Sequence, residues 1–196
     1  MSEFITFLQL GFEHIADLSA FDHLLFVITL CAVYRLAEWK KILILITAFT
    51  IGHSLTLVLA GFNILRVPSE LVEFLIPITI LVTALHNVGA KKAEGGTFSR
   101  GVSVNYLLAL FFGLIHGMGF ANFFRSLMGE MGGIALPLFS FNVGIELGQI
   151  LIVLLFFGFL YVMSRLFSFE HRSWNLFISG AGAGGALILI VQGFLN

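Results

Sequence analysis

The sequence of 196 residues has little charge and almost no cysteine. Lys, Arg, Asp and Glu together make up 11% of the residues, the net charge is −1, and Cys31 is the single cysteine. A soluble domain carries about a quarter of its residues as charged side chains, so this chain lacks the polar groups that a water-facing surface needs. A single cysteine excludes a disulfide-stabilised secreted domain, and the balanced charge argues against nucleic acid as a partner.

What the sequence has instead is apolar residues in long runs. Hydrophobic residues make up 59% of the chain, and the mean hydropathy is +1.04. A helix needs about 20 mostly apolar residues to cross a bilayer, and uninterrupted runs favour helices over barrel strands. The stretches that meet this requirement are about 20–37, 41–62, 68–89, 102–124, 135–164 and 174–195. We therefore predict an all-α polytopic membrane bundle of six transmembrane helices, with residues 1–196 forming a single integral membrane domain.

The first 19 residues form a different kind of segment. They are too few and too polar at their end to cross a bilayer, yet their apolar residues recur at helical spacing. These residues are Phe4, Phe7, Leu8, Phe12 and Ile15. We predict an amphipathic or re-entrant helix over 1–19 that lies on the membrane or folds back over the bundle.

A run of small residues, GAGAGG, lies within the last predicted span at 180–185. It puts Gly180 and Gly184 four residues apart, the spacing typical of closely packed membrane helices. The run therefore predicts helix packing rather than chemistry.

Basic residues collect in alternate loops. The loops that follow the first, third and fifth predicted spans hold 8 Lys or Arg residues, whereas those after the second and fourth hold 2, Arg66 and Arg125. The positive-inside rule assigns the more basic loops to the cytoplasm. We expect a multi-pass membrane protein with both termini on the side away from the cytoplasm and the lipid bilayer as its main surrounding.

Ionisable residues inside the predicted spans cluster at one depth. His53 lies 8 residues before residue 61, and His116 lies 8 residues before Phe124. At a rise of about 1.5 Å per residue, both imidazoles lie about 12 Å below the predicted outer surface. Glu146 lies about 16 Å below the same surface. Because ionisable groups at such depths are costly, they indicate a functional site in the outer half of the bilayer.

The residue types of this set favour a divalent metal. Imidazoles and carboxylates suit nickel, zinc, cobalt and ferrous ions, and the absence of thiolate ligands argues against a soft Cu(I) site. The predicted metal residues are Asp22, His23, His53, His116 and Glu146, with His14, Asp17, Asn142 and Gln149 as further lining. A proton relay built on the same residues is the alternative to a metal ion.

Five segments of the chain resemble the HupE/UreJ family of small bacterial membrane proteins. They are GFEHIADLSAFDHLLFVI (11–28), FTIGHSLTLVLA (49–60), LVEFLIPITILVTALHN (71–87), FGLIHGMGFA (112–121) and FNVGIELGQ (141–149). The resemblance implies a nickel or cobalt permease or accessory protein of the bacterial cytoplasmic (inner) membrane, linked to hydrogenase and urease, so that both termini are predicted to lie in the periplasm. It also implies that a His followed by an Asp-His pair handles the metal, which corresponds here to His14 and Asp22-His23. Seven residues separate the two parts, more than the short spacing associated with nickel permeases.

Three functions stay open at this point. The first is transport or handling of nickel, cobalt or a related divalent metal. The second is an intramembrane zinc-dependent hydrolase acting on lipid or peptide, in which the metal activates water and Glu146 or Asp22 serves as the base. The third is a non-catalytic subunit, stabilised by its metal, of a larger complex with protein partners in the membrane.

The shape of the site discriminates among these functions. Polar lining that reaches the inner face favours transport. A closed pocket with three protein ligands, an open metal position and a lateral opening to lipid favours catalysis, and saturated coordination without a cavity favours a structural role.

Overall fold

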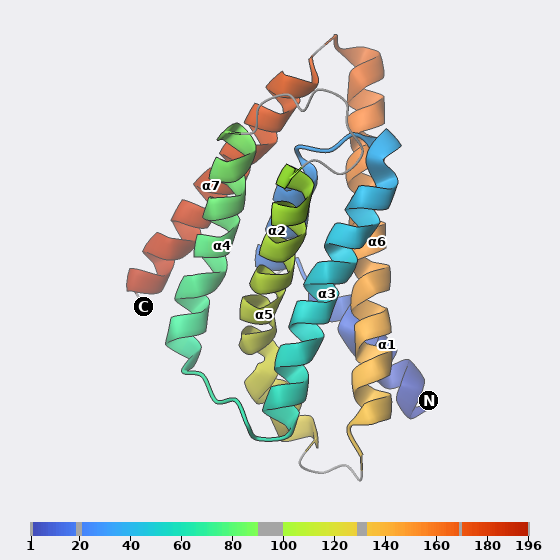
Figure 1. The fold of residues 1–196 in the computed structure, drawn as a ribbon, viewed down its shortest axis with the longest axis vertical. Helices are drawn as coiled ribbons and strands as arrows, with labels where there is room; N and C mark the ends of the chain where they lie inside the picture. The colour runs from blue at the N-terminus through green and yellow to red at the C-terminus, as the bar shows by residue number, and fades with distance from the viewer. Residues whose placement is uncertain (1, 19–20, 90–99, 129–132, 169, 196) are drawn as a thin grey trace.

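The computed structural model describes residues 2–18, 21–89, 100–128, 133–168 and 170–195 (Figure 1). All regular structure in these ranges is helical. The α-helices are α1 (Glu3–Ala16), α2 (Asp22–Cys31), α3 (Trp39–Gly61), α4 (Ser69–Gly89), α5 (Arg100–Met128), α6 (Ala135–Leu166) and α7 (His171–Leu195), and a short 3₁₀ helix, η1 (Leu36–Glu38), precedes α3.

Five of these helices, α3 to α7, are long and apolar enough to cross a membrane. Their bounds lie within a few residues of the five spans predicted from residue 41 onward. Large apolar side chains stay exposed along them, among them Leu154 and Leu155 on α6 and Leu187 on α7. Since a lipid-facing surface is apolar, these exposed side chains fit a multi-pass membrane protein.

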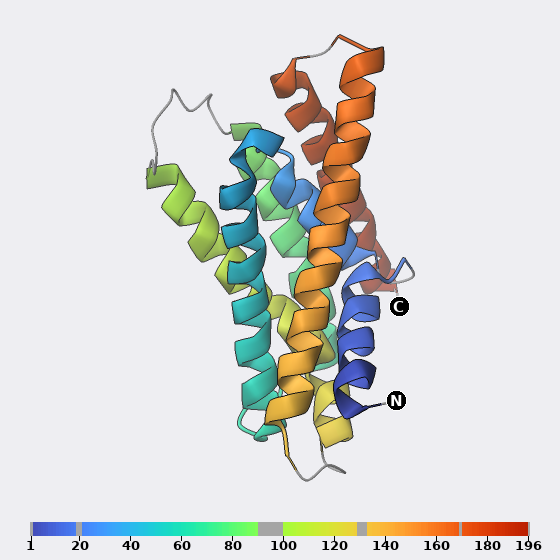
Figure 2. The same cartoon turned by 90° about the vertical axis from the view of Figure 1, so that its right-hand side faces the viewer.

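The first predicted span, 20–37, is wrong in its extent. The helix in that stretch, α2, has 10 residues, which at a rise of about 1.5 Å per residue covers about 15 Å, half of a bilayer core. Figures 1 and 2 show α1 beside the lower half of α6 and α2 in the upper half of the bundle, both running toward the same end. The described residues therefore form one broken segment, α1 plus α2, and five continuous helices.

The break has a local physical reason. The residues on either side of it, from His14 to His23, include Asp17 and Asp22, so the apolar run stops in the middle of the segment. Helix ends inside a membrane leave backbone groups without partners, and they are tolerated where protein or a polar site surrounds them. Here α1 ends and α2 begins beside the polar residues described below.

The N-terminal helix α1 packs closely on α6, which agrees with one of the two predicted placements of this segment, folded back over the bundle, rather than with a helix lying on the membrane. Glycines allow the approach from both sides, because a Cβ at Gly11 would collide with the carbonyl oxygen of Phe141, and one at Gly144 with that of Leu8. This contact holds the end of α1 inside the bundle.

A second close contact joins α3 and α5. A Cβ at Gly52 would collide with the carbonyl oxygen of Leu110, and one at Gly113 with that of Phe49. Gly117 continues the contact against the main chain of His53. The packing therefore sets the two helices at the distance and rotation at which His53 and His116 lie near each other.

The glycine run of α7 packs differently from its prediction. Gly180 and Gly184 have open space where a side chain would extend, whereas a Cβ at Gly182 would meet the side chain of Thr29 on α2. The run does support helix packing, but α7 is rotated so that Gly182, rather than Gly180 or Gly184, faces the neighbouring helix.

Candidate metal centre

Three histidines from three helices meet inside the bundle. His14 on α1, His23 on α2 and His53 on α3 each offer one ring nitrogen, and these nitrogens lie within 4.8 Å of one another. His14 is partly buried, whereas His23 and His53 are buried. Two nitrogens bound to one ion with bonds of about 2.1 Å lie at most about 4.2 Å apart, so small side-chain rotations bring this group onto a metal.

A fourth imidazole, that of His116 on α5, lies beside His23 of this group and is not one of the three whose nitrogens lie within 4.8 Å of one another. Its ring centre lies 5.0 Å from that of His23, and the side chain is fully buried. We call His14, His23, His53 and His116 the histidine cluster. It lies at the break between α1 and α2, and its members come from α1, α2, α3 and α5.

Most ring nitrogens of the histidine cluster have no hydrogen-bond partner among the described residues. The buried atoms without a partner are Nε2 of His14, Nε2 of His23, Nδ1 of His116 and both ring nitrogens of His53. A buried polar atom without a partner is costly, so such atoms require a ligand, an ion or an ordered water. Buried nitrogens without partners in a group of closely placed imidazoles favour a metal ion, which an imidazole binds through its lone pair.

Two polar residues orient the rings of the histidine cluster. Nδ1–H of His23 donates to Oδ1 of Asp22 at 3.0 Å, which leaves Nε2 of His23 with a free lone pair. The Thr79 hydroxyl donates to the carbonyl oxygen of Ile76 at 2.7 Å, so Nε2–H of His116 donates to the Thr79 oxygen at 3.0 Å. In metal sites, hydrogen bonds of this kind fix the tautomer and the direction of a histidine ligand.

Phenylalanines from four helices surround the histidine cluster. Phe120 lies 4.3 Å from His14 and Phe26 lies 4.9 Å from His116, measured between ring centres. Phe141 stacks on His53 at 6.3 Å, and Phe49 lies 5.2 Å from His116. An apolar shell lowers the local dielectric, which strengthens any charge interaction of a bound ion with Asp22.

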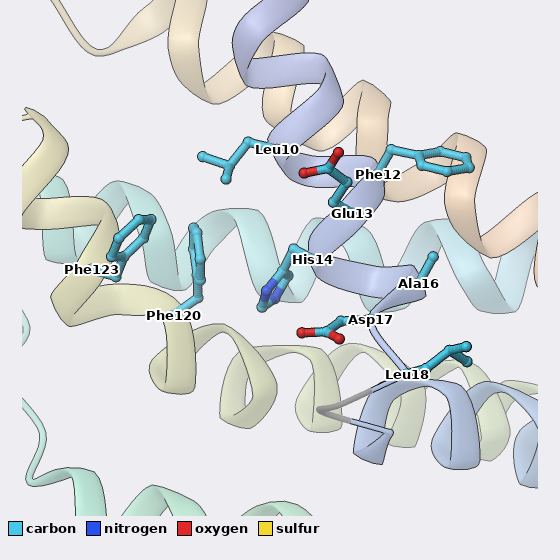
Figure 3. Close-up of a pocket in the computed structure, with 9 residues that line it drawn as sticks. All are labelled: Leu10, Phe12, Glu13, His14, Ala16, Asp17, Leu18, Phe120 and Phe123. Carbon is cyan, nitrogen blue, oxygen red and sulfur yellow. The ribbon is translucent and has the colours of Figure 1, made fainter.

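An open pocket of about 770 Å³ leads to one side of the histidine cluster (Figure 3). The apolar lining comes from Leu10, Phe12, Ala16, Leu18, Phe120 and Phe123, and the polar lining from Glu13, His14 and Asp17. Figure 3 shows the side chains of His14 and Asp17 next to each other at the end of α1. This pocket gives His14 a route to the outside of the bundle.

Glu146 lies in a second polar group, between α3 and α6. Its carboxylate oxygens accept hydrogen bonds from the hydroxyls of Thr47 at 2.6 Å and Thr50 at 2.7 Å. Thr50 also lies 2.9 Å from Oε1 of the fully buried Gln149. We call these residues the carboxylate cluster. Because the contacts of Glu146 are to hydroxyls, its role as a metal ligand stays a prediction.

The other predicted lining residues have different positions. Asp17 is exposed in the open pocket. Asn142 donates through Nδ2 to the carbonyl oxygen of Leu138, one turn back on α6, and its Oδ1 is buried without a partner among the described residues. The predicted role of each as lining of a metal site stays a prediction as well.

The sequence prediction missed Thr79, which orients His116. A signal for it exists in the sequence, because Thr79, Thr83 and Asn87 recur every four residues within an otherwise apolar span. That spacing puts them on one face of α4. The enclosing phenylalanines carry no comparable signal, since phenylalanine is common throughout the chain.

Comparison with known proteins agrees with the family resemblance. The family model described as HupE / UreJ protein matches residues 1–194, essentially the whole chain. No curated protein and no solved structure matches the chain.

Proposed function

The chain belongs to the HupE/UreJ family, and from that premise we propose that it binds a divalent metal of the nickel and cobalt class at the histidine cluster and carries it across the membrane. The metal is the cargo. His14, His23, His53 and His116 are its protein ligands, and Asp22 and Thr79 orient two of them. Metal enters from the predicted periplasmic side.

The observation that carries this proposal is the close approach of imidazole nitrogens from three helices, in a cluster that holds several buried nitrogens without partners among the described residues. The candidate nitrogens of three histidines lie within 4.8 Å of one another, and both nitrogens of the fully buried His53 have no partner among the described residues. Imidazole suits nickel, cobalt and zinc, so the ligand set by itself does not choose among them. The family supports nickel or cobalt.

The broken segment supports transport. Many transporters bind their substrate where a membrane helix is interrupted, because the interruption exposes polar backbone at a buried site. Here the break between α1 and α2 lies beside His14 and His23. Movement of either half-helix would change the number of imidazoles that contact the ion, which is a physical means of releasing it.

Metal analysis of the purified protein tests the proposal. Detergent-solubilised protein is equilibrated with Ni²⁺, Co²⁺ or Zn²⁺ in turn, desalted, and assayed by inductively coupled plasma mass spectrometry. With four imidazoles available, we expect about one ion per chain. His53→Ala and His116→Ala are each expected to abolish this binding, because each removes a fully buried ligand.

The matched control is His171→Ala. His171 contacts the carbonyl oxygen of Val33 at the other end of α2 and lies outside the histidine cluster. It is expected to retain full metal content. Full occupancy in the double variant His53→Ala, His116→Ala would refute the metal site. Metal-loaded protein in vesicles that take up no ion would refute transport.

A hydrolase is the second candidate, and the open pocket is the observation that favours it. Three imidazoles beside a largely apolar pocket resemble a catalytic zinc site, which has three protein ligands and one open position. Glu13 and Asp17 in that pocket are carboxylates that could act as a base. Zinc-dependent release of fatty acid from vesicle lipid, lost in Asp17→Asn, would favour this function over transport.

A further inference from the structure

The buried polar face of α4 continues away from the histidine cluster. Thr79, Thr83 and Asn87 lie at successive four-residue steps, and their exposed fractions are 2%, 5% and 3%. Each step advances about 6 Å along the helix. Thr79 contacts His116, so this face begins at the histidine cluster and runs toward the predicted cytoplasmic end of α4.

A small cavity lies at the far part of this face. Its volume is about 10 Å³, which is close to the space that one water molecule needs. Its polar lining comes from Thr83, His86, Asn87 and Asn105, and its apolar lining from Leu30, Leu108 and Phe112. The cavity therefore combines an imidazole, a hydroxyl and two amides within an apolar surround.

Around the cavity, donor groups of the lining are engaged in hydrogen bonds, whereas an acceptor oxygen has no partner within the described part of the chain. The Thr83 hydroxyl donates to the carbonyl oxygen of Thr79 at 2.8 Å, and Asn105 donates through Nδ2 to the Tyr34 hydroxyl at 2.7 Å. Oδ1 of Asn105 is buried and has no partner among the described residues. The engaged donors of Thr83 and Asn105, together with the free Oδ1 of Asn105, suit a cation.

We propose that the polar face of α4 and this cavity form the inner passage for the metal, with His86 and Oδ1 of Asn105 as a second, transient set of ligands. This inference rests on the proposed transport function and gives it a route. The ion leaves His116, passes Thr83 and pauses at His86 before it reaches the cytoplasm.

The chemistry of the passage matches conduction rather than storage. Conduction requires ligands strong enough to replace water and weak enough to release the ion. Hydroxyl and amide oxygens are weak ligands for nickel or cobalt, whereas the single imidazole of His86 is stronger. One imidazole at the cavity therefore holds the ion less tightly than the four imidazoles of the histidine cluster.

Uptake by reconstituted vesicles tests the passage. Thr83→Val and His86→Ala are each expected to lower the initial rate of Ni²⁺ or Co²⁺ uptake about tenfold, equivalent to about 1.4 kcal/mol on the barrier. The metal content at the histidine cluster should stay unchanged. Thr56→Val is the matched control, because Thr56 is equally buried and also donates to a main-chain oxygen, that of Leu114. Variants that transport at the control rate would overturn the passage.

A metal-bridge measurement tests the cavity whether or not the protein transports. In a background of Cys31→Ala and His53→Ala, Thr83→Cys is expected to create a Cd²⁺ site from the new thiolate and His86. Equilibrium dialysis should detect one additional Cd²⁺ per chain, which adding His86→Ala removes and which Thr56→Cys lacks. Absence of this site would overturn the passage, whereas its presence in a protein that takes up no metal would refute only the proposed transport.

Discussion

The histidine cluster and the carboxylate cluster meet α3 on neighbouring turns, but His53 of the first and Glu146 of the second differ in their hydrogen bonding. His53 and Thr50 are three residues apart on that helix. The two nitrogens of His53 have no partner among the described residues, whereas both carboxylate oxygens of Glu146 accept hydroxyl protons. A carboxylate inside the membrane is therefore not by itself the sign of a metal site, since hydroxyls of a neighbouring helix can stabilise it.

The two clusters also differ in what they join. The histidine cluster brings together the broken segment, α3 and α5, whereas the carboxylate cluster joins the continuous helices α3 and α6. A hydrogen bond to a charged group contributes about 1.5–3 kcal/mol. We expect the carboxylate cluster to hold α3 against α6. This pair of helices would then stay in place when α1 or α2 moves.

The largest expected effect in this comparison comes from Asp22. Asp22→Ala removes the acceptor that orients His23, and loss of such a partner lowers metal affinity by about 10–100-fold. Asp22→Asn keeps an acceptor oxygen and should recover much of the affinity, as measured by isothermal titration with Ni²⁺ or Co²⁺. Equal and complete loss in both variants would show instead that Asp22 is a direct ligand.

A smaller effect is expected at Thr79. Thr79→Val preserves the shape of the side chain but removes the oxygen that accepts Nε2–H of His116. Affinity should fall about tenfold, the lower end of the range for such partners. The histidine NMR spectrum of the zinc-loaded protein should show a changed tautomer balance at His116 alone. An unchanged spectrum would mean that Thr79 does not orient the ring.

The smallest effect on metal binding is expected at Glu146. Glu146→Gln keeps one acceptor oxygen for Thr47 or Thr50, so metal content should stay at the wild-type level while the melting temperature falls slightly. Mass spectrometry of the metal and a thermal melt measure the two quantities. Loss of the metal with an unchanged melting temperature would make Glu146 a ligand, as the sequence predicts, and would remove the distinction between the clusters.

The part of the candidate site that follows from the sequence is the part that depends on one helix at a time. The stripe of Asn142, Glu146 and Gln149 follows from helical spacing, as do the similar depths of His53 and His116. Sequence reasoning could not assign Glu146 to the threonines of α3, because that pairing depends on the rotation of α6 against α3. It also could not give the extent of α2, because hydropathy averages over a window and overlooks a break.

Hydropathy and helical periodicity by themselves determined that the chain is a membrane bundle, where its five long helices lie and which ionisable residues lie within them. These properties are local, since each depends on the composition of one segment. Only the tertiary structure decided which of those residues meet. The glycine contacts of Gly11 with Phe141 and of Gly113 with Phe49 set the distance and rotation between helices. Contacts of that kind bring His14 to His53 and leave Glu146 with the threonines, because the position of a side chain across a bundle depends on how closely two backbones approach.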